Sequence, residues 1–160
     1  MESNKAARPV VRRRGNLWTG LDELVVEEDE DGEVIQFFIA GIPRPTQTGS
    51  TIRVGKRSFP TYRNTEWAGY CRLAAAQMRE KILEGPVVLE LTFFLPRPKK
   101  PKCEVPITRP DLDNLQKKLL DGFNGILWRD DSQVVESHVK KRYADQDGPG
   151  LLVQVRAYEL

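Results

Sequence analysis

The sequence is poor in the residue types that build zinc sites and membrane spans. It has two cysteines and one histidine in 160 residues, and neither Cys71 nor Cys103 stands in a CxxC or histidine-paired spacing. A structural zinc site is therefore not expected. No apolar run approaches the ~20 residues that cross a bilayer, and residues 1–14 are polar and basic, unlike a secretory signal. We expect a cytoplasmic protein with reduced thiols and no membrane partner.

The small net charge of +2 hides an uneven distribution. Eight acidic residues lie between Asp22 and Glu33, whereas residues 34–160 hold 20 Lys and Arg against 14 Asp and Glu. The part of the chain that follows the acidic run is therefore basic. A basic surface suits a partner with a phosphate backbone, because phosphate neutralisation supplies most non-specific nucleic-acid affinity.

Length and composition predict one globular domain preceded by an arm. A chain with 39% hydrophobic and 30% charged residues is typical of a globular protein. Residues 1–32 switch from an arginine run to an acidic run without sustained periodicity, which predicts a flexible charged arm with at most a short turn or strand at 21–26. The arm could touch DNA or be a solvated tail. Residues 33–160 form the predicted domain.

Apolar periodicity predicts an α+β fold with a mixed β-sheet of about four strands and two main helices. Runs of β-branched and aromatic residues predict strands, and apolar residues at helical spacing predict helices. The expected order is a strand at 33–40, a long basic loop or hairpin at 43–63, a helix at 64–83, a strand at 87–94, an exposed basic connector at 96–102, a helix from 111 to about 124, and two paired strands at 133–142 and 151–158.

Five carboxylates are concentrated between Asp111 and Asp131. Asp111 and Asp113 come directly after Pro110, so a helix can begin only near Asp111 and both carboxylates lie at or before its first turn. Asp131 precedes a predicted strand, whose pairing could bring it to the other two. Clustered carboxylates are the oxygen ligands that Mg²⁺ prefers. Lys117, four residues after Asp113, can approach the same centre.

The same residues carry a family resemblance. Arg109-Pro-Asp-Leu-Asp-Asn-Leu-Gln-Lys117, followed by Trp128-x-Asp-Asp-x-Gln-Val-Val135, closely resembles the RusA-type Holliday junction resolvases of bacteria and their phages. Two features depart from that pattern. Pro110 stands where related sequences often have another basic residue, and the N-terminal arm looks like an addition.

The resemblance implies an activity and a set of residues. It implies a homodimeric endonuclease that cuts four-way DNA junctions with Mg²⁺, in DNA recombination and repair in a bacterium or phage-infected host. Asp111, Asp113 and Asp131 would hold the metal and, with Lys117, carry catalysis. Candidate nucleic-acid contacts are Arg57, Lys99, Lys100, Arg109, Lys118 and Arg129. Lys140, Lys141 and Arg142 are further candidate phosphate contacts, and for these three and Arg129 a solvated face is about as good an interpretation.

Three other interpretations stay open from the sequence alone. Asp111 could be only a helix cap and Asp130-Asp131 only a solvated turn, because each is common by itself. The protein could be a structure-specific DNA-binding protein without catalysis. It could also be a nuclease that acts on flaps or forks.

Overall fold

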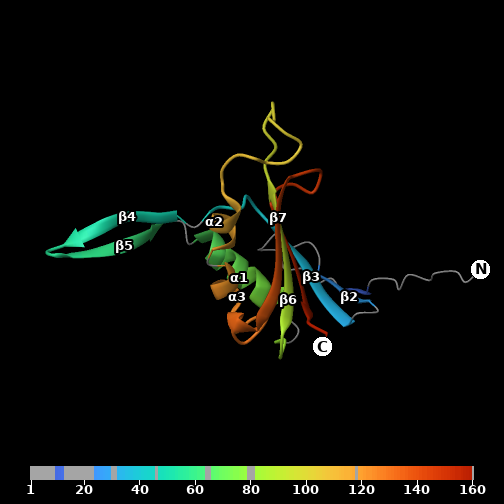
Figure 1. Cartoon of the computed structure of the whole chain (residues 1–160). Coiled ribbons are helices and arrows are strands. Elements are labelled where there is room, and N and C mark those ends of the chain that lie inside the picture. Colours follow the sequence, from blue (N-terminus) through green and yellow to red (C-terminus); the bar gives the residue numbers. More distant parts are fainter. Residues whose placement is uncertain are drawn as a thin grey trace, which may run out of the picture.

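In a computed structural model of the chain, all three helices pack on one face of a mixed sheet (Figure 1). The structure describes residues 10–12, 24–29, 32–45, 47–63, 66–78, 82–117 and 119–159. The sheet has six strands in the order β1-β2-β3-β8-β6-β7, and a separate hairpin is formed by β4 and β5. The strands are β1 (Val10–Arg12), β2 (Leu24–Asp29), β3 (Gly32–Ala40), β4 (Gln47–Val54), β5 (Arg57–Arg63), β6 (Val87–Leu95), β7 (Val134–Tyr143) and β8 (Gly150–Ala157). The predicted α+β class is confirmed.

The core lies between the helices and the central strands β3, β8 and β6. Alternate residues of these strands point to the helices, as the period of two requires, and Phe37, Val153 and Leu91 lie side by side across the three strands. All three side chains are fully or almost fully buried. This face of the sheet gives the helices next to it a rigid support.

The first helix, α1 (Glu66–Met78), forms because its apolar residues recur every three to four positions. Trp67, Cys71, Ala74 and Ala75 are buried in the core. The second predicted helix, 111 to about 124, is instead two short helices, α2 (Leu112–Gln116) and α3 (Leu119–Phe123). The helix breaks because Lys117 has φ −53° and ψ 134°, outside the helical region.

The predicted pairing of the last two strands is wrong. β6 lies between them, parallel to β7 and antiparallel to β8. The long segment from β6 through α2 and α3 is a crossover connection, and such connections join parallel strands. β7 is consequently an edge strand, which explains why most of its side chains are exposed.

Two segments lie outside the strands β3, β8, β6 and β7. β4 and β5 form a long hairpin that projects away from the helices (Figure 1), which confirms the hairpin alternative for residues 43–63. In the stretch predicted as an arm, the described residues form β1 and β2, and β2 pairs with β3. The sheet therefore begins before residue 33, whereas the division of the chain at residue 32 stays a prediction.

None of the described helices is long and apolar enough to cross a membrane.

Candidate active site

Asp111 and Asp113 lie at the start of α2, as the sequence predicts. Asp111 has extended backbone (φ −72°, ψ 145°) at the position before the helix, where its carbonyl oxygen accepts a hydrogen bond from Leu115 N at 3.1 Å. Its carboxylate forms no capping hydrogen bond. Both aspartates are exposed. Capping therefore does not account for the Asp111 side chain, whose oxygens face solvent.

A lysine on β7 fixes the backbone that leads into α2. Lys141 Nζ donates hydrogen bonds to the carbonyl oxygens of Thr108 (2.9 Å) and Pro110 (3.0 Å). One turn along α2, Gln116 Nε2 lies 3.5 Å from Ser137 Oγ. α2 therefore runs alongside β7 in the opposite direction. Lys141 was a candidate phosphate contact, but its ammonium group already holds the chain just before Asp111.

Asp130 and Asp131 have different roles although they are neighbours. The Asp130 carboxylate caps the short helix η1 (Asp131–Gln133) and accepts a hydrogen bond from Ser132 N at 2.9 Å. Hydrogen bonds from the side chain and then the backbone of Ser132 lower the pKa of the Asp130 carboxyl below its usual value. Asp130 therefore has a structural role. Asp131 is the first residue of the helix that Asp130 caps, and its side chain is half-buried.

Gln133 joins this turn to the segment before β6, a role that the sequence analysis missed. Its Oε1 accepts hydrogen bonds from the backbone N–H groups of Arg129 (2.8 Å) and Asp130 (3.0 Å). Its Nε2 donates to the carbonyl oxygens of Leu83 (3.1 Å) and Gly85 (2.8 Å). The Asp130-x-x-Gln133 spacing is that of a capping box, so the signal was present in the sequence.

The described residues do not bring the three predicted aspartates into one group. No three Asp, Glu, His or Cys side chains among them form a cluster that could hold a metal ion. The reason is the position of α2 along β7: Asp111 is tied near Lys141, whereas Asp131 precedes the start of that strand, which spans on the order of 20 Å up to Lys141. Mg²⁺ is often held by one or two carboxylates together with substrate phosphate and water. The Asp111–Asp113 pair has that donor chemistry.

The predicted nucleic-acid contacts lie in three different settings. Lys99, Lys100 and Arg109 are exposed in the loop between β6 and α2, and Arg57 is exposed at the tip of the β4–β5 hairpin. Arg129 instead forms an ion pair with Glu84, with Nη2 2.5 Å from Oε1. Lys118 lies outside the described residues, and Lys117 is exposed at the end of α2.

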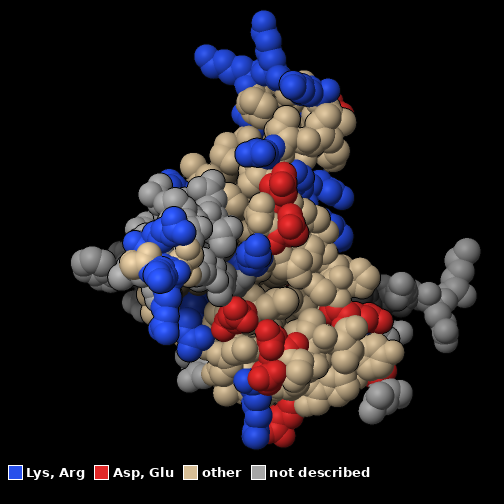
Figure 2. Space-filling model, turned by 60° about the vertical axis from the view of Figure 1, so that its left-hand side comes forward, with Lys and Arg blue, Asp and Glu red and all other residues tan. Residues whose placement is uncertain are grey.

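Two basic surfaces flank the acidic residues of the helical side. We call residues 96–110 the basic loop, with five Lys and Arg and one Glu, and residues 47–63 the basic hairpin, with four Lys and Arg and no acid. Figure 2 shows Lys and Arg gathered at the top of the molecule, over the basic loop, and on the left, over the basic hairpin. Asp and Glu side chains form a band that runs down the molecule from below the basic loop, to the right of the basic hairpin. A polyanion that spans both basic surfaces would pass over this band.

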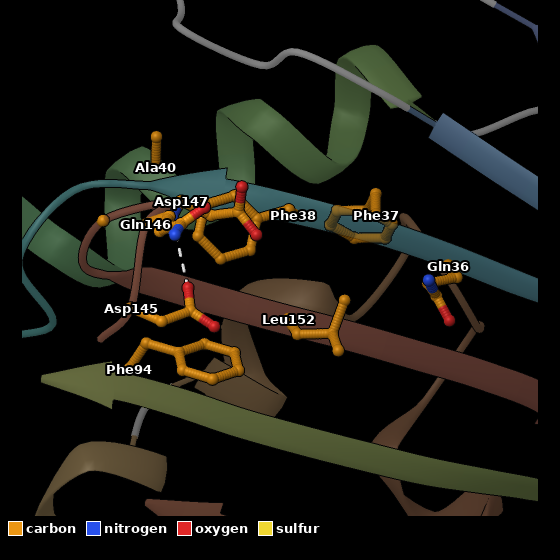
Figure 3. A pocket seen from close by; sticks show the side chains of 10 residues that line it. Gln36, Phe37, Phe38, Ala40, Phe94, Asp145, Gln146, Asp147 and Leu152 are labelled. Carbon is orange, nitrogen blue, oxygen red and sulfur yellow. Dashed lines mark hydrogen bonds between the residues drawn. The ribbon is translucent and has the colours of Figure 1, made fainter. Parts of the chain in front are cut away.

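A hollow on the opposite face of the sheet is not part of this site. It has a volume of about 570 Å³ and is lined by Phe38, Phe94, Leu152 and the turn that contains Asp145 and Asp147 (Figure 3). By strand register these side chains point away from the helices. The hollow is therefore separated from Asp111 and Asp113 by the thickness of the sheet.

Comparison with known proteins identifies the family. Residues 41–156, most of the chain, match the family model described as Endodeoxyribonuclease RusA. The chain belongs to the RusA endodeoxyribonuclease family. It is also similar to an uncharacterized protein, YqaN, of Bacillus subtilis (strain 168), with 37% identity over 142 residues that cover 78% of this chain and 96% of YqaN.

The RusA match includes both basic surfaces and the segment with all the candidate catalytic residues. It begins at Gly41, directly after β3, and ends in β8 at Arg156. The strands β1, β2 and β3 precede the matched segment. The site therefore lies wholly within the part of the chain that is similar to endodeoxyribonucleases.

Proposed function

We propose that this RusA family member is a Mg²⁺-dependent endonuclease that resolves four-way DNA junctions by paired symmetric cuts in recombination and repair. The observation that supports this most is the Asp111 carboxylate. It stands at a helix start without capping that helix, two residues from a second exposed carboxylate, in a chain region with basic surfaces on both sides. Exposed carboxylates near phosphate are unfavourable unless a cation is bound between them.

Four side chains would have separate roles in the proposed hydrolysis. Asp111 and Asp113 would hold Mg²⁺, and Asp131 joins the set because of its place in the family pattern, so DNA binding would have to bring it to the other two. Mg²⁺ bound there would polarise the scissile phosphate and lower the pKa of a bound water. Lys117 would offset negative charge that develops on the phosphate during hydrolysis.

The two basic surfaces would bind the DNA arms. On the hairpin, Arg53, Lys56 and Arg57 are exposed around the turn at Gly55. A two-stranded β-ribbon fits into the major groove of DNA, and exposed Lys and Arg side chains on it bind phosphates. We propose that the basic hairpin grips one DNA arm while the basic loop lies near the branch point.

A homodimer would account for paired cuts. A four-way junction has two equivalent strands to cut, and a protein with two-fold symmetry can place one active site on each. Cleavage at one strand only, by a protein that is monomeric when bound, would contradict this part of the proposal. Analytical ultracentrifugation of the protein with and without junction measures the stoichiometry.

The decisive experiment compares Asp113→Asn with the wild type on labelled four-way junction, linear duplex, flap and fork, with Mg²⁺ and with EDTA. Asp113→Asn should lose at least ~10²-fold in single-turnover cleavage, because a metal ligand is removed, and should bind the junction as tightly or more tightly. The matched control is Asp147→Asn, which removes the same charge from an exposed turn on the other face of the sheet.

Each outcome has a clear meaning. Equal cleavage by Asp113→Asn and wild type would remove the carboxylate from the mechanism. Junction binding without cleavage by either protein would indicate a binding protein instead of an enzyme. Faster cleavage of flaps or forks than of four-way junctions would replace the proposed substrate. Thermal unfolding of each variant tests whether a lost activity is simply lost folding.

A further inference from the structure

Two exposed apolar side chains flank a buried proline in the basic loop. Ile107 is 63% exposed and Val105 is 40% exposed, whereas Pro106 between them is buried. Exposed, buried and exposed residues follow one another here, so Pro106 points into the protein and the side chains before and after it point to solvent. Val105 and Ile107 therefore form one outward-facing apolar edge, which we call the apolar edge.

The apolar edge is held in place at Pro106 and by the residues that follow Ile107. Pro106 is anchored in the protein below it, and the carbonyl oxygens of Thr108 and Pro110 accept hydrogen bonds from Lys141 at 2.9 and 3.0 Å. The backbone next to Ile107 is thus fixed to β7. A single exposed apolar residue on a surface needs no explanation, but a fixed pair of them four to six residues before Asp111 is placed to contact the substrate.

The surroundings of the apolar edge identify what it contacts. Lys99, Lys100, Lys102 and Arg109 are all exposed in the same loop. The one acidic residue of the loop, Glu104, has its Oε2 3.8 Å from Arg97 Nη2. Figure 2 shows Lys and Arg side chains gathered at the top of the molecule, over this loop. An apolar surface in a loop rich in exposed cations is complementary to a polyanion that also offers an apolar face, as stacked bases do.

We propose that Val105 and Ile107 form a wedge that enters the branch point of a DNA junction. There the two side chains pack against an unpaired base or the exposed face of an unstacked base pair. Apolar side chains inserted between base steps unstack them, and Ile and other aliphatic residues serve in this way. Insertion is least costly where stacking is already interrupted, so the wedge selects branched DNA over linear duplex. This inference rests on the proposed function and assigns its substrate selectivity to two named residues.

The test measures binding and unstacking with the cleavage step removed. Asp113→Asn serves as the parent, and Ile107→Ala and Val105→Ala/Ile107→Ala are added to it. A four-way junction carries 2-aminopurine at the branch point, and a linear duplex carries it at its centre. The matched control is Ile42→Ala, which shortens another exposed isoleucine outside the loop.

We expect the parent and the Ile42→Ala control to raise the 2-aminopurine fluorescence of the junction and not of the duplex. The double variant should lose that rise and bind the junction roughly tenfold more weakly, which corresponds to ~1.4 kcal/mol, with duplex affinity unchanged. Ile107→Ala should lie between. A fluorophore on Cys103, which is exposed whereas Cys71 is buried, should respond to junction more than to duplex in the parent.

Several results would overturn the inference. If the parent binds the junction and the double variant matches it in fluorescence and in the ratio of junction to duplex affinity, the wedge is wrong and the proposed function stands. If neither the wild type nor the parent binds junction, both fail. If the double variant loses sedimentation with vesicles containing phosphatidylserine but keeps junction binding, the apolar edge serves a membrane surface instead.

Discussion

Removal of the Gln133 side chain should loosen the turn that carries Asp131. The amide makes four hydrogen bonds at 2.8 to 3.1 Å, two at each end, and so joins the Asp130 cap to Leu83 and Gly85. Gln133→Ala deletes all four at once and leaves the Asp130 carboxylate in place.

The size of the effect follows from the exposure of these bonds. One of the four is partly buried and three are exposed, where water can replace the lost partner. A net hydrogen bond contributes ~0.5–1.5 kcal/mol, and the lower value applies to the exposed ones. Gln133→Ala should therefore lower the free energy of unfolding by about 2 kcal/mol, or Tm by about 4–8 °C for a chain of this length.

A second variant separates the two ends of the amide. Gln133→Glu keeps an acceptor for the N–H groups of Arg129 and Asp130, but its carboxylate faces the carbonyl oxygens of Leu83 and Gly85. Those carbonyls raise its pKa above the unfolded value of ~4.3. The protonated form then fits better, so the stability deficit of Gln133→Glu should shrink as pH falls through the folded pKa and grow as pH rises.

Three measurements on Gln133→Ala test whether Gln133 positions Asp131. They are denaturant unfolding, the single-turnover cleavage rate and the affinity for the junction. We expect slower cleavage with nearly unchanged affinity, because Asp131 moves while the basic surfaces do not. Gln146→Ala, which truncates an exposed glutamine of the β7–β8 turn, is the control. The reasoning is refuted if Gln133→Ala unfolds and cleaves as that control does.

Three further expectations concern cationic and thiol side chains. Lys117→Ala should slow single-turnover cleavage by ~10²-fold or more with little change in junction affinity; a normal rate with a weaker salt dependence of binding would make it a plain phosphate contact. Lys141→Met should increase hydrogen exchange just before Asp111 and slow cleavage, whereas Lys140→Met, which removes a 3.8 Å ion pair with Glu90, should do neither. Burial raises the pKa of the Cys71 thiol far above its usual value. Below the unfolded pKa of ~8.5 the thiol is neutral in both the folded and the unfolded chain, and above it the thiol ionises only in the unfolded chain. The free energy of unfolding should therefore fall as pH rises past ~8.5, and it should fall less in Cys71→Ala. A thiol reagent should modify only Cys103 until the protein unfolds.

Local patterns predicted most of the elements because each is set by residues close in sequence. The strand at 33–40, the helix from 64 and the strand at 87–94 correspond to β3, α1 and β6. The alternation of buried and half-buried residues in β6 is the period-two signal itself. The turn residues between 43 and 63 likewise indicated a long loop or a hairpin, and the structure has the hairpin.

Sheet order could not be derived in the same way. β7 and β8 are joined by a short turn and both alternate, which in a sequence is the usual signature of a hairpin. The competing interaction is long-range: the apolar face of β6 pairs with β8 on one side and β7 on the other. Only the burial of Leu89, Leu91 and Phe93 on a shared core face makes that order favourable, and no local signal reports it.

The position of the site residues shows the same limit at closer range. Sequence spacing placed Asp111 and Asp113 together at a helix start, because they are two positions apart and Pro110 fixes where a helix can begin. It could not place Asp131, since that depends on where α2 lies along β7, and the Lys141 hydrogen bonds to Thr108 and Pro110 set that position. The structure also separates the helix-capping role of Asp130 from its neighbour Asp131, which the sequence alone does not do.

The tethers around the site explain how Asp111 and Asp113 can stay exposed without disturbing the fold. Gln133 and Lys141 hold backbone, not carboxylates, so the aspartates contribute little to stability and keep their oxygens for a ligand. A site built in this way should tolerate neutral substitutions of Asp111 and Asp113 with small changes in unfolding free energy. Cleavage should slow when either tether is cut, because Asp111 and Asp113 lose their fixed backbone without Lys141 and the turn that carries Asp131 loosens without Gln133.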